Sequence, residues 1–103
     1  MAILALVTGK MTHDQYEALR REVEWEGRQP PGAMFHVASF DELGNIHVAD
    51  VWASPGEMER FYSERLEPAM EKLSILPPSV IQIYPCHDVT AYPTLDKHLL
   101  QRT

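Results

Sequence analysis

The segment that decides the fold runs from Ala33 to Glu57 and reads AMFHVASFDELGNIHVADVWASPGE. Two stretches in it, 33–41 and 46–53, are rich in apolar and aromatic residues and are typical of strands. The short stretch between them ends at Gly44, a hairpin-loop position that requires a positive φ. The segment therefore predicts two antiparallel strands joined by a three-residue loop.

A capped helix is predicted directly after the second strand. Ser54 is typical of an N-cap, Pro55 of the first helical position, and Glu57 completes a capping box. Apolar residues then recur at helical spacing, at Met58, Phe61, Tyr62, Leu66, Ala69 and Leu73. Pro68 lies inside this run and predicts a kink or a restart near Leu66.

The flanking sequence adds a strand and a helix before the hairpin and one strand after the second helix. Residues 2–8 predict the first strand, and Thr12 with Gln15 forms a capping box for the helix that follows. That helix should stop before Gly27. Its buried face carries Tyr16, Leu19 and Val23. Residues 79–86 alternate as a last strand, so the order is βαββαβ, an α+β fold with both helices on one face of an antiparallel sheet.

The sheet face without helices is predicted to bind a second copy of the chain. It would carry Phe35, Val37, Ala49 and Val51, which are too apolar to leave in water. A two-fold homodimer through this face is the simplest cover. The tail, 87–103, is predicted to form an arm, with Thr94 placed to cap a short helix through Leu100, and such an arm is free to reach a neighbouring subunit.

Length and charge exclude several classes of protein. The 103 residues fit one domain, 1–103. The net charge of -6 and the lack of a basic cluster exclude a nucleic-acid partner. The apolar start, 2–7, is too short to span a membrane, so no membrane partner is expected. Cys86 is the only cysteine, which excludes an internal disulfide and predicts a cytoplasmic protein.

The hairpin brings candidate catalytic residues together. If its loop pairs Asp41 with Asn45, counting back sets His36 opposite Asp50 and Met34 opposite Trp52. Side chains of His36, Asp50 and Trp52 then share one face. Asp50 would orient the His36 imidazole as a base, and Trp52 would supply an apolar wall. The alternative is a structural pair in which the two polar side chains satisfy each other.

Further aromatic residues are candidates for binding a substrate. Phe61 and Tyr62 start the inner face of the second helix and could close a pocket, which Tyr84 on the last strand would join. The alternative for all three is ordinary core packing. Trp25, beside a Gly-Pro loop, is either a lid or a hydrophobic staple.

The sequence predicts neither a metal nor a cofactor. Its five histidines do not fall at i, i+3 or i+4 spacing on any one helix, and His36 and His47 are predicted on opposite faces of the sheet. It has no Gly-rich phosphate loop, CxxC, HExxH or GxSxG motif.

Several segments together resemble the dimeric α+β barrel superfamily, in particular small uncharacterised bacterial proteins akin to the antibiotic biosynthesis monooxygenases. The segments are PGAMFHVA at 31–38, Gly44, DVWAS at 50–54, Phe61, RLEPA at 65–69 and YPCHDV at 84–89. The resemblance covers about residues 2–90. It implies a ferredoxin-like monomer that pairs through its sheet and holds a cavity between sheet and helices.

The resemblance also bears on activity. Cofactor-independent oxygenases and heme-degrading enzymes of this superfamily place a tryptophan where Trp52 stands, and many relatives have glutamate at the position of Asp50. Phe61 stands where the oxygenase pattern often has a histidine. The helical histidine and the strand-one asparagine of the heme-degrading branch are both missing, so the resemblance does not imply heme.

Three functions remain open from the sequence. The first is a cofactor-independent monooxygenase acting on small aromatic or polyketide-like compounds, with His36 and Asp50 as catalytic residues. The second is a non-catalytic protein that binds a small apolar or aromatic ligand. The third is a structural protein in which Trp52, Tyr62 and Met58 fill the space between sheet and helices and leave no cavity.

Overall fold

The computed structural model describes residues 1–99 of the chain. Its elements are β1 (Ile3–Lys10), α1 (His13–Val23), β2 (Ala33–Phe40), β3 (Asn45–Trp52), α2 (Pro55–Phe61), a π-helical segment η1 (Tyr62–Leu66), α3 (Glu67–Lys72), β4 (Val80–Pro85) and a 3-10 helix η2 (Pro93–His98). The expected end of the last helix at Leu100 lies outside the described residues. The predicted βαββαβ order is confirmed.

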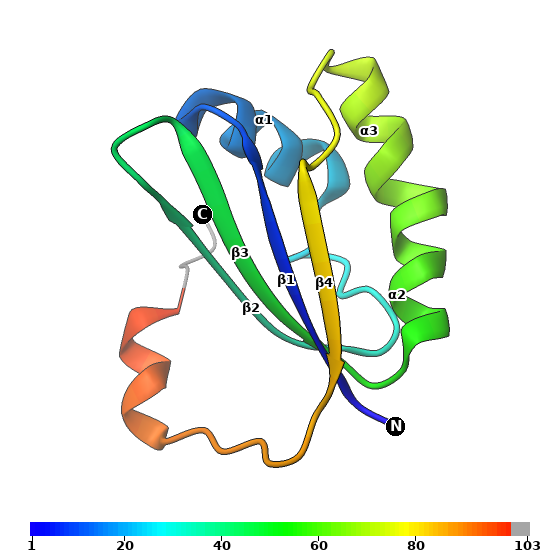
Figure 1. Ribbon diagram of the computed structural model, residues 1–103, viewed down its shortest axis with the longest axis vertical. Coiled ribbons are helices and arrows are strands. Elements are labelled where there is room, and N and C mark those ends of the chain that lie inside the picture. Colours follow the sequence, from blue (N-terminus) through cyan, green and yellow to red (C-terminus); the bar gives the residue numbers. More distant parts are fainter. Residues whose placement is uncertain (100–103) are drawn as a thin grey trace.

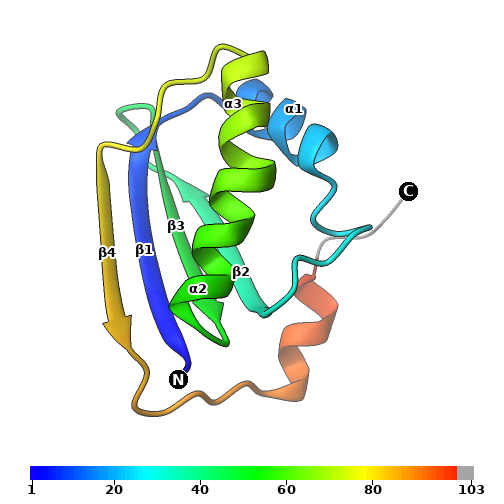
Figure 2. The same cartoon turned by 90° about the vertical axis from the view of Figure 1, so that its right-hand side faces the viewer.

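The four strands form one antiparallel sheet with the order β2-β3-β1-β4, the ferredoxin-like topology (Figure 1). Helices α1, α2 and α3 all lie on the same side of this sheet, as Figure 2 shows. Alternate residues of β1 are buried, namely Ile3, Ala5, Val7 and Gly9. The core lies between this face and the helices, so both layers contribute to any site there.

The second helix is continuous through its proline. Phe61, Tyr62 and Glu67 all have right-handed helical backbone angles, and the wider turns of η1 precede Pro68. Proline lacks an N–H and its ring collides with the carbonyl of the previous turn, and a π segment relieves both problems without ending the helix. The predicted break near Leu66 is therefore a widened stretch of helix.

The hairpin loop is held by the side chain of Asp41. Its Oδ1 accepts hydrogen bonds from the backbone N–H groups of Leu43 and Asn45 at 2.9 and 3.0 Å. Its Oδ2 lies 2.8 Å from Nε2 of His47, and this hydrogen bond with the backbone donors holds the pKa of the Asp41 carboxyl well below its usual range. The backbone N–H of Asp41 donates to the Asn45 carbonyl at 3.0 Å, which confirms the predicted pairing.

One part of the predicted register is wrong. His36 does pair with Asp50, but Trp52 pairs with Ala33, because a β-bulge lies between Ala33 and Phe35. Loop hydrogen bonds fix the strand at that end: the N–H of Ala33 donates to the Pro30 carbonyl at 3.0 Å, and the Gly32 carbonyl accepts from Ala53 at 2.8 Å. Met34 is the extra residue that the bulge absorbs.

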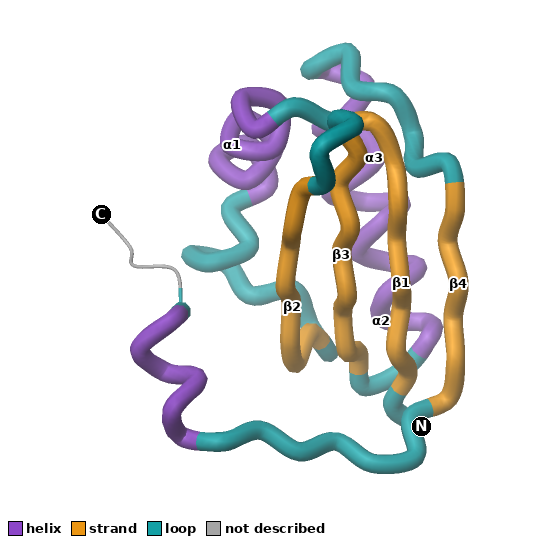
Figure 3. The backbone as a smooth tube through the Cα atoms, turned by 60° about the vertical axis from the view of Figure 1, so that its left-hand side comes forward, coloured by secondary structure: helices purple, strands orange, loops and turns teal. Residues whose placement is uncertain are grey.

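The chain after β4 leaves the sheet rather than continuing it. It passes the ends of the strands and returns beyond the β2 edge, where η2 lies (Figures 1 and 3). Tyr92 occupies the N-cap position of η2 and Pro93 its first turn, so Thr94 is not the cap that the sequence predicted. The contact of this arm with a neighbouring subunit stays a prediction.

Candidate functional site

Three polar side chains form a hydrogen-bonded chain on the helix-covered face of the sheet. The Nδ1 atom of His36 lies 2.6 Å from Oδ1 of Asp50, and its Nε2 atom lies 2.8 Å from the hydroxyl oxygen of Tyr16. A carboxylate only accepts, so Nδ1 carries the hydrogen, and Nε2 of the neutral ring then accepts the Tyr16 O–H. The site is therefore an Asp50–His36–Tyr16 chain in which, with a neutral imidazole, Asp50 accepts from His36 and His36 accepts from Tyr16.

Each member of the chain comes from a different element. His36 lies on β2 and Asp50 opposite it on β3, where hairpin register and side-chain alternation place both toward the helices. Tyr16 lies on α1, with its ring almost parallel to that of His36, at an interplanar angle of 1° and a centroid distance of 6.4 Å. Trp25, in the loop after α1, packs beside both rings. The centroid of its ring lies 5.6 Å from that of Tyr16 and 5.2 Å from that of His36.

The chain lies in the wall of a cavity of about 470 Å³ between the sheet and the helices. Most of the lining is apolar or aromatic, including Leu19, Trp25, Ile46, Trp52, Phe61 and Met70. A volume of this size is typical of small-molecule sites. The purely structural alternative predicted a filled space, and the cavity contradicts it.

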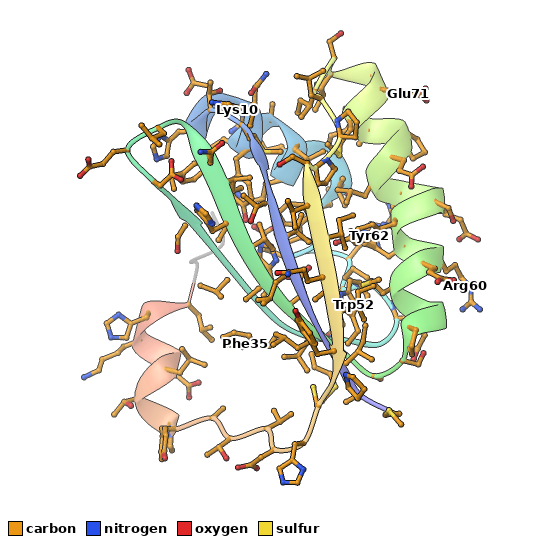
Figure 4. All side chains as sticks on the ribbon, in the orientation of Figure 1. Lys10, Phe35, Trp52, Arg60, Tyr62 and Glu71 are labelled. Carbon is orange, nitrogen blue, oxygen red and sulfur yellow. The ribbon has the colours of Figure 1, made fainter. Side chains whose placement is uncertain are left out.

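The structure brings most of the predicted site residues to this cavity. His36, Asp50, Trp52, Phe61 and Tyr62 all line it. In Figure 4 the labelled Trp52 and Tyr62 side chains lie between the sheet and the continuous helix formed by α2, η1 and α3. Trp52 is only 3% exposed, and its ring packs 5.4 Å from that of Phe61.

Tyr84 does not join the cavity. It pairs with Leu4, and the alternation of β1 places Leu4 on the face opposite to Ile3 and Ala5. Tyr84 therefore lies on the outer face of the sheet and is 47% exposed. Its predicted place beside Phe61 and Tyr62 is therefore wrong, and a part in binding a substrate stays a prediction.

The polar groups of the cavity include the hydroxyl groups of Tyr16 and Tyr62, the Asp50 carboxylate and the indole N–H of Trp52, and Lys10 and Glu26 also line it. Burial, followed by the charges of Glu26 and Asp50, raises the pKa of the Tyr16 hydroxyl far above its usual range. Burial and then Asp50 raise the pKa of Tyr62 in the same way. The indole N–H of Trp52 is buried and has no hydrogen-bond partner among the described residues. The cavity therefore offers hydroxyl groups that stay protonated at neutral pH.

Sequence reasoning missed the parts played by Tyr16 and Trp25. Tyr16 was expected only on the buried face of the first helix, and Trp25 as a lid or a staple. A signal for Tyr16 existed, because a buried tyrosine needs a partner for its hydroxyl. The partner could not be named, since α1 and the hairpin meet only in three dimensions.

Neither a metal centre nor a membrane segment is found in the described part of the chain. Within residues 1–99, no three histidine, cysteine or acidic side chains lie close enough together to hold a metal ion. Over the same residues no helix has the length and apolar content needed to cross a membrane.

These features define a class: a small ferredoxin-like α+β protein with a cavity between its sheet and its helices. Solved structures place the chain more closely, in the fold of the antibiotic biosynthesis monooxygenase-like proteins, which confirms that expectation. One is a candidate antibiotic biosynthesis monooxygenase from Chloroflexus aurantiacus, with a TM-score of 0.65 and 17% identity over 88% of this chain and 98% of the other. A similar candidate from Deinococcus radiodurans has a TM-score of 0.57 and 17% identity, covering 89% and 98%.

A third neighbour is described as a cofactor-independent oxygenase, SnoaB from Streptomyces nogalater. Its TM-score is 0.57, with 12% identity over 85% of this chain and 92% of the other. No protein-family model matches the chain, and no curated protein sequence matches it significantly. At these identities the likeness establishes the fold, and function has to be argued from the site.

Proposed function

We propose that the protein binds a small apolar or aromatic molecule in the cavity and oxidises it with molecular oxygen, without a cofactor. The observation that carries this proposal is the hydrogen-bonded Asp50–His36 pair in the wall of an apolar cavity of about 470 Å³. A carboxylate that orients an imidazole supplies a base for proton abstraction. The SnoaB neighbour, described as a cofactor-independent oxygenase, supports the choice of reaction.

The proposed reaction begins at a C–H group that an aryl ring and a carbonyl make acidic. His36 takes up the proton, directly or through a neighbouring group, and leaves a carbanion stabilised as the enolate. The carbanion forms a C–O bond with molecular oxygen, and the proton returns to give a hydroperoxide. Loss of water then breaks the O–O bond and leaves a new carbonyl. One CH₂ group and one O₂ molecule therefore become one C=O group and one water.

Non-catalytic ligand binding is the second candidate. Both ring nitrogens of His36 already have partners, so the polar chain is satisfied without a substrate. A binding protein would be stabilised against heat by ligands that it leaves chemically unchanged. The test of the proposed reaction therefore has to measure binding and turnover separately.

Oxygen uptake with 2-tetralone, a ketone with an acidic CH₂ group between its aromatic ring and its carbonyl, tests the proposed function. We expect the ketone to quench the fluorescence of Trp25 and Trp52, which line the cavity. In air we expect oxygen to be consumed in equal amount to a product that is heavier by one oxygen atom and lighter by two hydrogens. Binding without oxygen uptake would favour the second candidate.

We also propose that a second copy of the chain covers the outer face of the sheet. Among residues 1–99, the helices lie on the other side of the sheet and leave this face uncovered (Figure 2). Phe35, Val37 and Tyr84 on it are 39%, 43% and 47% exposed. Burying such side chains is worth about 25 cal/mol for each Å² removed from water. In a two-fold dimer the same patch on each subunit contacts its copy, so the apolar area of this face is buried on both subunits.

Light scattering on the Val37→Glu variant tests the dimer. We expect the wild-type protein to have twice the mass of one chain, and the variant to have the mass of one chain, because the dimer would bury two facing carboxylates. Leu43→Glu is the matched control, since Leu43 is 78% exposed in the hairpin loop, away from the sheet face. A monomeric wild type would contradict the proposal.

A further inference from the structure

His36 has no nitrogen free to accept a proton from a molecule in the cavity. Its Nδ1 hydrogen is donated to Asp50, and its Nε2 lone pair accepts the Tyr16 hydroxyl at 2.8 Å. An imidazole has no third polar atom. A ligand could reach His36 directly only by breaking the Tyr16 bond, so within the Asp50–His36–Tyr16 chain the atom that a ligand can approach is the next one along.

That atom is the hydroxyl oxygen of Tyr16. A hydroxyl has one hydrogen, which here goes to His36, and two lone pairs, which accept. Tyr16 lines the cavity, and His36 is the hydrogen-bond partner of its hydroxyl among the described residues. We propose that Tyr16 is the catalytic residue that takes the proton from the bound molecule, while His36 and Asp50 act through it as positioning residues. This inference rests on the proposed function and specifies its first step.

The proton transfer proceeds along the three side chains in order. The substrate C–H bond breaks, its electron pair stays on carbon, and its proton forms a bond to the Tyr16 oxygen. The hydroxyl hydrogen of Tyr16 moves at the same time to Nε2 of His36, which becomes an imidazolium beside the Asp50 carboxylate. The chain gains one proton and the substrate one negative charge, and the reverse movement returns the proton later.

The electrostatics of the cavity suit this concerted transfer. Burial and the carboxylates of Glu26 and Asp50 raise the pKa of Tyr16, so the phenolate is disfavoured as a resting state. Asp50 is buried, at 7% exposed, and its charge compensates an imidazolium on His36. Tyr16 therefore passes a proton on without keeping a charge.

The lining of the cavity indicates the class of ligand. Most of the cavity wall is apolar or aromatic, which suits a ligand that arrives uncharged. Trp25 packs beside Tyr16 and offers a flat surface to an aromatic ring. The ligand is therefore a neutral weak carbon acid with an aryl ring next to the acidic carbon, such as an aryl-substituted ketone.

Exchange of deuterium into 2-tetralone, measured by NMR under nitrogen, tests the proton step apart from oxygen chemistry. We expect the wild-type protein to catalyse exchange at the CH₂ group between ring and carbonyl. Tyr16→Phe should lower the rate by about 10²-fold, the low end for loss of an acid–base group. Its half-saturation concentration should stay the same, because the ring that packs against Trp25 remains. His36→Asn should lower the rate equally, and Tyr92→Phe, a matched change at a residue that is 72% exposed, should not.

The outcomes distinguish the inference from the proposed function. If Tyr16→Phe exchanges as fast as wild type or faster while His36→Asn is inactive, His36 accepts the proton directly and the part assigned to Tyr16 is overturned. If the wild type exchanges deuterium as expected but consumes no oxygen in air, the relay stands and the oxygenase reaction fails. Binding without exchange, or no binding of the ketone, overturns the relay.

Discussion

Turnover is expected to fall by about 10²- to 10⁴-fold when His36 is replaced by alanine, the range for loss of an acid–base group. The variant removes the acceptor of the Tyr16 hydroxyl and the partner of Asp50 together. Oxygen uptake with 2-tetralone at saturating concentration measures the effect. Binding of the ketone should change much less, since apolar residues make up most of the cavity wall.

Stability has to be measured on the same variants, because Asp50 loses its partner. An unpaired buried polar group costs about 1–3 kcal/mol, and His36→Ala should show a loss in this range by urea denaturation. His36→Asn separates the two effects, since asparagine keeps an N–H donor opposite Asp50 but takes up no proton at neutral pH. We expect it to be as inactive as the alanine variant and more stable. Activity that follows stability across both variants would contradict a chemical role for His36.

The second large effect is expected at Trp52. Replacing it by alanine should lower the free energy of unfolding by about 3–5 kcal/mol, the usual cost of removing a buried large aromatic side chain. Trp52 is 3% exposed and packs against Phe61, and it belongs to the core cluster that joins sheet and helices. Urea denaturation followed by circular dichroism measures this loss without depending on the tryptophan signal.

Trp52→Phe is the matched control for that prediction. The indole N–H of Trp52 makes no hydrogen bond with the described residues, so phenylalanine gives up no polar interaction. It also keeps an aromatic ring against Phe61. Phenylalanine is smaller than tryptophan and leaves part of the space empty, so we expect a cost that is present but clearly below that of alanine. A cost as large as that of alanine would show that the N–H has a partner in solution.

The candidate catalytic pair was predictable from sequence because it depends on local geometry. The loop that ends at Gly44 fixes which residues of two adjacent strands face each other, and the period of two in a strand fixes the face. His36 and Asp50 are five residues before and five after the paired residues Asp41 and Asn45. Between these positions the pairing of β2 with β3 has no bulge, so opposite residues can be found by counting from the loop.

Two wrong predictions concern residues whose partner or face does not follow from counting along the hairpin. On the other side of His36 the strand has a β-bulge at Met34, next to the loop hydrogen bonds of Gly32 and Ala33, and Trp52 pairs with Ala33 instead of Met34. Tyr84 lies on β4, which pairs with β1, a strand far from it in the sequence. Alternation alone cannot decide which face such a strand turns inward.

The bulge at Met34 has a consequence for how this protein can change over evolutionary time. A bulge absorbs one residue of mismatch between two strands. Insertions or deletions in the loop before β2 can therefore be taken up at that point, before the chain reaches His36. Between His36 and Asp50 no such buffer exists, and one added strand residue would turn one partner to the other face. Lineages that keep this pair should therefore vary in length upstream of Met34 and hold the hairpin constant.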